Sequence, residues 1–222
     1  MRAGREMPLD DTCEIRVENM WIIHHPAPKQ SVLKRNFRAR VRESIHDGHL
    51  ANTRLGHAVA LTQLHSFKAA LAELNETVFA QREILERDPE RQVVEQDLLD
   101  ALLALGKVQM ATGDYDAATR SLSECIAIAR KISSVGKAGL YEERYLALAN
   151  FVMRDLGAEL ATRAHGAEAA RYRSEAGSHY ADALAIWSRW RSENLAKAYA
   201  SREEQAVLRS KAALEQTLTV NH

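Results

Sequence analysis

The stretch LLALGKVQMATGDYDAATRSLSEC, residues 102–125, decides the fold because two helical patterns meet in it at one short turn. On each side of the turn, apolar residues recur at the spacing of a helix with one buried face. They are Leu102, Leu105 and Val108 before the turn, and Ala118, Leu122 and Cys125 after it. Gly113 interrupts the first pattern, and the carboxylate of Asp114 can cap the free N–H groups of the second helix. The stretch therefore predicts a helical hairpin.

This pattern is repeated along the chain. At an offset of 48 residues, Phe67-Lys68-Ala69-Ala70 matches Tyr115-Asp116-Ala117-Ala118, and Leu74, Thr77 and Arg82 match Leu122, Cys125 and Arg130. A fainter copy, at an offset of 58 from Ala118, contains Ala176, Tyr180, Ala183 and Ile186. A helical unit that cannot bury its apolar face alone stacks on its neighbours, which is why such units occur in arrays.

From residue 49 to the end, the sequence is typical of helix with a few interruptions. The breaks are His65-Ser66, Asp88-Pro89, Gly113-Asp114, Ser133 to Gly139, and His165-Gly166. Ser66, like Asp114, is expected to cap the helix that follows it. We therefore predict an all-α domain over 49–222, made of about three helical hairpins and a C-terminal helix.

Residues 1–48 differ in composition from the rest of the chain and contain three of the four prolines, Pro8, Pro26 and Pro28. Ile15, Val17, Trp21 and Ile23 alternate loosely with polar residues, which predicts one short strand. A single strand has no partner to pair with. We therefore expect a poorly structured arm that is partly disordered or packs on the helical body.

The arm contains a basic segment, residues 29–42, without an acidic residue. Its cations are Lys29, Lys34, Arg35, Arg38, Arg40 and Arg42. Three interpretations stay open: a solvated surface, an intramolecular contact with the acidic region Glu73–Asp100, or a phosphate-binding arm that includes Phe37.

Composition excludes several classes of protein. Thirty basic residues balance thirty acidic ones, so no overall field recruits nucleic acid or an anionic membrane. The two cysteines, Cys13 and Cys125, form no metal-binding motif or disulfide framework. No signal peptide or membrane span is evident. We expect a cytoplasmic protein with no membrane association.

Motifs for chemistry are missing from the sequence. His24-His25 and His46-x-x-His49 have no carboxylate or cysteine at a coherent ligand spacing, and no nucleophile motif such as G-x-S-x-G occurs. Cys125 is expected to be a packed, inert thiol. Trp187 and Trp190 are expected to pack in the core near the end of the stack. We expect no catalytic residue, metal or cofactor, and hence no enzyme.

The residues Leu102-x-x-Leu105-Gly106, Gly113-Asp114-Tyr115 and Ala118-x-x-x-Leu122-x-x-Cys125 resemble one full tetratricopeptide repeat. The resemblance implies an alpha-alpha superhelix, with Gly106 and Ala118 at the closest approach of paired helices and Tyr115 beside the turn. The copy before it departs from the pattern at His57-Ala58 and His65.

The array is also similar to the tetratricopeptide segments at the C-terminal end of bacterial serine/threonine protein kinases. The phrase Tyr180-Ala181-Asp182-Ala183-Leu184-Ala185-Ile186-Trp187 carries this similarity. The chain has no glycine-rich loop, H-R-D or D-F-G motif, so the kinase activity is not implied.

The resemblance implies a scaffold or adaptor that binds a peptide or helix of a protein partner in a concave groove. The predicted contacts are Leu103, Lys107 and Met110 in the best repeat, and Asn150 and Arg154 in the third pair. An alternative is a nucleic-acid-associated regulator that uses the basic arm 29–42, with binding that depends on Arg35, Arg38 and Arg40. A third hypothesis, an enzyme on a helical array, requires a deep polar pocket.

Overall fold

The computed structural model describes residues 15–17, 20–22, 49–89, 91–134 and 139–220, which fall into two compact units, Met1–Ile45 and His46–His222. The first unit contains the strands β1 (Ile15–Val17) and β2 (Met20–Ile22), which pair antiparallel with Ile15 opposite Ile22. The single unpaired strand expected from the sequence is therefore replaced by a pair of short strands. The basic segment 29–42 lies outside the described residues, and its role stays a prediction.

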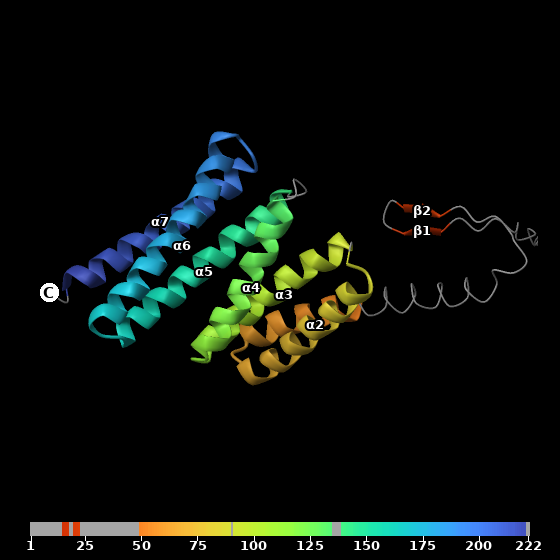
Figure 1. Cartoon of the computed structure of the whole chain (residues 1–222), viewed down its shortest axis with the longest axis horizontal. Coiled ribbons are helices and arrows are strands. Elements are labelled where there is room, and N and C mark those ends of the chain that lie inside the picture. Colours follow the sequence, from red (N-terminus) through yellow and green to blue (C-terminus); the bar gives the residue numbers. More distant parts are fainter. Residues whose placement is uncertain (1–14, 18–19, 23–48, 90, 135–138, 221–222) are drawn as a thin grey trace, which may run out of the picture. The chain divides into compact units, whose positions relative to one another are not determined.

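The described residues of the second unit form seven helices in chain order (Figure 1). They are the first helix (residues 49–63), α2 (Phe67–Arg87), α3 (Gln92–Ala111), α4 (Tyr115–Ser134), α5 (Leu140–Arg163), α6 (Gly166–Ser192) and α7 (Lys197–Val220). From α2 to α7, each helix packs against the next one in the sequence, and α3 also contacts α5. The all-α prediction is confirmed.

The turns lie at the predicted breaks, and their backbone explains why. His65, Gly113 and Gly166 adopt positive φ angles of 58°, 81° and 55°. This left-handed conformation ends a helix, and glycine adopts it without steric cost. The turn between α6 and α7 uses Asn194 and Ala196 in the same region, with φ of 58° and 41°.

The two capping predictions have opposite outcomes. The Asp114 side chain accepts a hydrogen bond from the Ala117 amide at 3.1 Å, as expected for an N-cap. Ser66 precedes α2, but its hydroxyl makes no cap hydrogen bond, so the prediction for Ser66 is wrong. Its φ and ψ of −82° and 56° lie outside the extended conformation typical of an N-cap residue.

The sequence repeat corresponds to equivalent helices. Helices α2 and α4 begin at Phe67 and Tyr115, which are the residues matched at the 48-residue offset. The repeat-related positions are buried in each copy: Ala70, Ala118 and Ala176 at one position, and Thr77, Cys125 and Ala183 at another. Helix α6 begins earlier relative to this pattern, so the third unit has a longer second helix.

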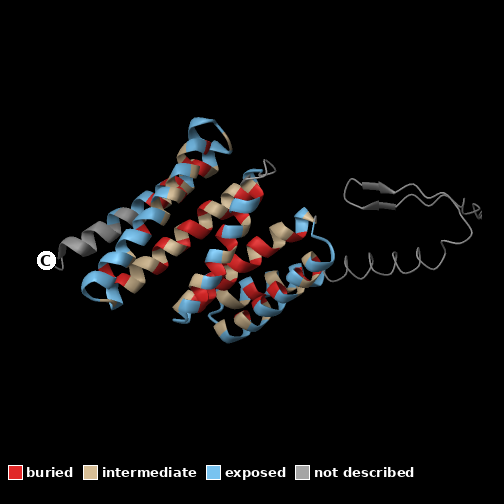
Figure 2. Cartoon of the chain, viewed as in Figure 1, coloured by how far each residue is buried: buried red, intermediate tan, exposed pale blue. Residues whose placement is uncertain are grey.

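Two clusters of buried side chains form the core of the second unit. The larger one joins the first helix and α2–α5, and a smaller one contains Trp187 and Trp190 with side chains of α5 and α7. Figure 2 shows buried positions concentrated in α3–α5. Helix α5 has no exposed residue between Tyr141 and Ala161, because α3, α4 and α6 all pack against it.

Small residues allow the paired helices to approach closely. A Cβ added to Gly106 would lie 2.6 Å from Cγ of the buried Leu122, so α3 and α4 approach one another closely at this glycine. A Cβ added to Gly157 would lie 3.1 Å from the Ala176 Cβ, where α5 meets α6. A side chain at Gly106 would therefore displace Leu122, and one at Gly157 would require a small shift of its neighbour.

Candidate partner-binding site

Polar side chains on α3, α5 and α7 form one connected network, which we call the α3–α5–α7 face. It consists of Asp100 and Lys107 on α3, Tyr141, Arg144 and Tyr145 on α5, and Tyr199, Arg202 and Glu203 on α7. Asp100 and Lys107 are seven positions apart on α3, and the first tyrosine on α5 and on α7 precedes the other two residues of its helix by three and four positions, so each set lies toward one side of its helix. The face is therefore built by three helices that are not adjacent in sequence.

Asp100 is held by two tyrosines of the neighbouring helix. The Tyr141 hydroxyl donates to one carboxylate oxygen at 2.6 Å, and the Tyr145 hydroxyl donates to the other. The two rings lie 4.7 Å apart. Burial and the hydrogen bond to Asp100 raise the pKa of both tyrosines above their usual value. Both hydroxyls therefore stay protonated at neutral pH, and each donates to one oxygen of the Asp100 carboxylate.

Arg144 extends from α5 to α7. Its Nε donates to the Tyr199 hydroxyl at 2.8 Å, and Nη1 lies 3.4 Å from the Tyr145 hydroxyl. The guanidinium carbon lies 5.2 Å and 5.6 Å from the centres of the Tyr145 and Tyr199 rings, which is cation–π range. Arg202 contacts the Tyr199 ring as well, at 5.1 Å, and pairs with Glu203 at 3.2 Å.

Lys107 is exposed on α3, as its predicted role requires. Protein atoms around its ammonium group nevertheless desolvate the charge and lower the pKa of Lys107, and the positive charge of Arg144 lowers it further. Glu203 and Asp100 oppose this shift. The Lys107 cation therefore lies within electrostatic range of both α5 and α7.

The other predicted contacts in α3 are placed differently. Leu103 is 5% exposed and belongs to the larger core cluster, and Met110 is half-buried against the same cluster. The spacing argument assumed that α3 packs only against its paired helices. Since α3 also contacts α5, its apolar side is wider, and Leu103, one turn beyond Asp100, is covered.

Asn150 and Arg154 lie inside the helical stack instead of on an open surface. Asn150 is fully buried, where its amide donates to the Leu146 carbonyl and its Oδ1 lies 2.7 Å from Nδ1 of His179 on α6. Arg154 is 3% exposed, pairs with Asp155 at 3.0 Å, and lies over the Phe151 ring. The one-turn spacing was correct, but it does not reveal that α6 covers this side of α5.

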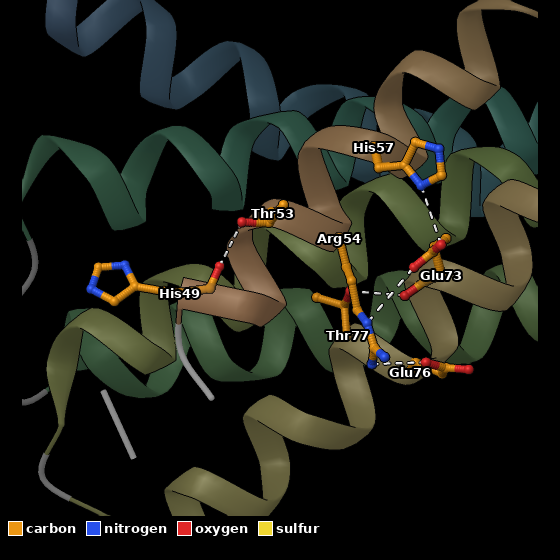
Figure 3. A network of polar contacts seen from close by, with 7 residues as sticks. All are labelled: His49, Thr53, Arg54, His57, Glu73, Glu76 and Thr77. Atoms are coloured by element: carbon orange, nitrogen blue, oxygen red, sulfur yellow. Dashed lines mark hydrogen bonds and ion pairs between the residues drawn. The ribbon is translucent and has the colours of Figure 1, made fainter. Parts of the chain in front are cut away.

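A second polar network joins the first helix to α2 (Figure 3). Arg54 pairs with Glu76 at 2.7 Å, and Glu73 approaches both Arg54 and His57, at 3.9 Å and 3.2 Å. All of these side chains are at least partly exposed. Exposed ion pairs of this kind contribute about 0–1 kcal/mol each to stability. We therefore interpret the network as a set of weak contacts that link the two helices.

Two surface cavities occur on this first pair of helices. One, of about 610 Å³, lies along His65 to Ala72, and the other, of about 170 Å³, is lined by Leu50, Phe79 and neighbouring residues of the first helix and α2. Neither includes a residue of the α3–α5–α7 face. The smaller cavity is also lined by the charged residues Arg54, Glu83 and Arg87, of which Glu83 and Arg87 pair with one another at 3.5 Å.

Cys125 is fully buried, and its Sγ lies 3.6 Å from the Leu99 carbonyl oxygen. Burial, with the charges of Asp100 and Glu124, raises the pKa of the thiol to about 12. A thiol in this environment is a poor nucleophile at neutral pH. The prediction of a packed thiol is confirmed, and its low reactivity stays a prediction.

The described residues contain no group of three His, Cys, Asp or Glu side chains that could hold a metal ion. In the same part of the chain, no helix combines the length and apolar character needed to cross a bilayer. Trp187 and Trp190, by contrast, pack as expected: both are buried, with ring centres 5.2 Å apart in an edge-to-face arrangement.

Sequence reasoning missed the tyrosines and Arg144. The signal was present in α5, where Tyr141, Arg144 and Tyr145 stand at the spacing of one helix face, and in α7, where Tyr199 precedes Arg202 by three residues. What the sequence does not give is the crossing of α3, α5 and α7 that brings these faces together.

Comparison with known proteins identifies no relative: no family model matches the chain, and neither a curated protein nor a solved structure matches it.

Proposed function

We propose that this protein is a protein-interaction scaffold that binds a segment of a partner protein on the α3–α5–α7 face. The observation that carries this proposal is the set of tyrosines and arginines on α5 and α7: Tyr141, Arg144 and Tyr199 are half-buried, Tyr145 is buried and Arg202 is exposed. Tyrosine and arginine are enriched where proteins bind one another, since both combine a large contact surface with directional hydrogen bonds.

The order of the helices supports the same function. Antiparallel helices that pack in chain order are typical of helical repeat arrays, and every second helix contributes to one side of such an array. Helices α3, α5 and α7 are alternate helices of this kind. The resemblance of residues 102–125 to a tetratricopeptide repeat, whose groove is lined by the first helix of each pair, agrees with this placement.

Binding is favoured over catalysis by the chemistry of the face. The pKa values of Tyr141 and Tyr145 are raised by burial and by Asp100, which makes both poor general bases at neutral pH. Asp100 uses both of its oxygens for these hydroxyls. The remaining exposed groups, Lys107 and Arg202, are donors suited to recognition.

Site-specific photocrosslinking tests the proposal. Benzoylphenylalanine is introduced at Lys107 or Arg202, which are exposed on the face, and the source cells are irradiated. We expect discrete adducts with one or a few proteins, identified by mass spectrometry.

Exposed positions on other helices, Lys68 on α2 and Arg173 on α6, are the matched controls. Adducts that form equally from both sets, or from neither, would contradict a binding site on the α3–α5–α7 face.

A further inference from the structure

Arg144 is a partly buried cation with no carboxylate partner among the described residues. Its neighbours in hydrogen-bond range are the hydroxyls of Tyr199 and Tyr145, both neutral groups. On the adjacent helix α6, Arg189 pairs with Glu143 and Arg191 with Glu204, at 2.5 Å and 2.8 Å. A partly desolvated charge is normally neutralised, so the Arg144 environment is incomplete without an anion.

Lys107 is in the same situation. The described residues place no carboxylate within ion-pair distance of its ammonium group, although Asp100 and Glu203 lie within electrostatic range. Asp100 is occupied by two tyrosine hydroxyls, and Glu203 pairs with Arg202. Lys107 and Arg144 therefore lie within electrostatic range of one another, and Asp100 and Glu203 offset part of their repulsion, although no described carboxylate forms an ion pair with either cation.

The face contains charges of both signs. Lys107, Arg144 and Arg202 are cations, Asp100 and Glu203 are anions, and Asp97 on α3 lies within electrostatic range of Tyr141. A nucleic-acid backbone needs several cations in a row without interspersed carboxylates, so this face is unsuited to it.

We propose that the α3–α5–α7 face recognises an acidic side chain, Asp or Glu, of the bound partner segment, with the carboxylate held by Arg144 and Lys107. The Tyr199 and Tyr145 rings hold the Arg144 guanidinium in place, and its Nη2 atom, which has no hydrogen bond to a described residue, is available to the ligand. A guanidinium fixed in this way loses little side-chain entropy on binding a carboxylate. The proposal rests on the proposed function, whose binding face it uses.

Nuclear magnetic resonance titration tests the site without a known partner. The probe is N-acetyl-glutamate N-methylamide, which carries one carboxylate, and its glutamine analogue is the neutral isostere. The reporter is the Arg144 Nε–H resonance, which the hydrogen bond to Tyr199 protects from exchange and which is assigned with Arg144→Lys. We expect a saturable shift with the glutamate probe and none with the glutamine probe.

The variants identify the residues responsible. Lys107→Gln, an exposed and structurally mild change, is expected to raise the apparent Kd by about fivefold, the effect of one charge-assisted contact. Lys68→Gln on α2 is the matched control and should leave the Kd unchanged. Equal shifts with both probes, no shift with either, or an unaltered Kd in Lys107→Gln would overturn the proposal. Tighter binding of inorganic phosphate would overturn it too, in favour of a phosphate site.

The scaffold function and the carboxylate site can be contradicted independently of one another. If photocrosslinks form at Lys107 and Arg202 but the glutamate probe does not bind, the face is an interaction surface that does not select acidic residues. If the probe binds and no adducts form, the carboxylate site stands and the scaffold function is wrong.

Discussion

Gln81 is a polar residue in the core of the helical unit. It lies on α2, is 1% exposed, and neither its amide nitrogen nor its carbonyl oxygen has a hydrogen-bond partner among the described residues. A buried polar group left unpaired costs about 1–3 kcal/mol. By contrast, the Gln109 amide oxygen accepts a hydrogen bond from Ser121 at 2.8 Å. The two glutamines therefore allow the effect of a side-chain hydrogen bond on stability to be compared for the same residue type.

Replacement of Gln81 by methionine, which has a similar length and no strong hydrogen-bonding group, is expected to stabilise the protein by about 1 kcal/mol. Gln109→Met should destabilise it by a comparable amount, because the Ser121 hydroxyl then loses its partner. Urea unfolding followed by far-ultraviolet circular dichroism measures both free energies of unfolding. Two changes of the same sign would show that pairing does not decide the outcome.

His179 links stability to pH. Its Nδ1 donates to Asn150 Oδ1, since the Asn150 amide nitrogen already donates to Leu146. Burial lowers the pKa of His179, as does the nearby charge of Arg130, whereas Asp182 and Glu175 act in the opposite direction. The folded state therefore favours the neutral ring.

Because the folded pKa of His179 lies below the unfolded value of about 6.5, the unfolded chain binds the proton first as the pH falls. We expect this contribution to be fully present above the unfolded pKa and to decrease as the pH falls through it, until the folded ring titrates too. Urea midpoints at pH 8 and pH 5 should fall more in the parent protein than in His179→Gln. An equal decrease in both would exclude His179 as the source.

At the scale of secondary-structure elements, the contact between α3 and α4 depends on Gly106. Its backbone packs directly on Leu122, a fully buried residue that cannot move aside. Gly177 in α6 is also within a helix, but a Cβ added there has no neighbour within 4 Å. These two glycines share a helical backbone and differ only in what their missing side chain would contact.

Gly106→Ala is expected to destabilise the protein by about 1–2 kcal/mol, since overpacking outweighs the higher helix propensity of alanine. Gly177→Ala should stabilise it by up to about 1 kcal/mol, because propensity alone is changed. Thermal denaturation of both variants checks the pair. A stabilised Gly106→Ala protein would mean that Leu122 can repack.

The helices and turns show which parts of the fold could be predicted from the sequence. Helix type, the repeat and five turns follow from apolar spacing and from residues such as Gly113 and Asp88-Pro89. The turn at Glu193–Ala196 has no glycine or proline to mark it, and its left-handed residues are Asn194 and Ala196. Of the residues on the α3–α5–α7 face, only Lys107 is predicted from the sequence. The contacts between α3, α5 and α7 depend on how these helices cross, and this is not apparent from the local sequence of any one helix.

For the whole helical unit, two core clusters of unequal size meet at α5. Leu148 packs against both of them. The larger cluster contains Cys125, and the smaller one contains Trp187 and Trp190. In helical arrays, stability is carried by contacts between neighbouring units, and a smaller terminal cluster can unfold before the rest.

We therefore expect the tryptophans to report unfolding at a lower urea concentration than Cys125 does. In a variant with Trp21→Phe and Cys13→Ser, tryptophan fluorescence reports only the smaller cluster, and thiol labelling reports only the larger one. The fluorescence shift should precede the rise in Cys125 labelling, since the thiol is buried and its pKa is raised to about 12. Coincident transitions would show that the two clusters unfold as one cooperative unit.

The packing of α2 to α7 against successive neighbours also has a kinetic consequence. Extensive contacts join consecutive helices, and the additional pair α3 and α5 is separated by a single helix. Most of these helix pairs are neighbours in the sequence, so the chain forms its core mainly by packing each helix on the next one. Folding speed in small domains rises as the mean sequence separation of contacting residues falls. We therefore expect the described helices to assemble rapidly, mainly one neighbouring helix at a time.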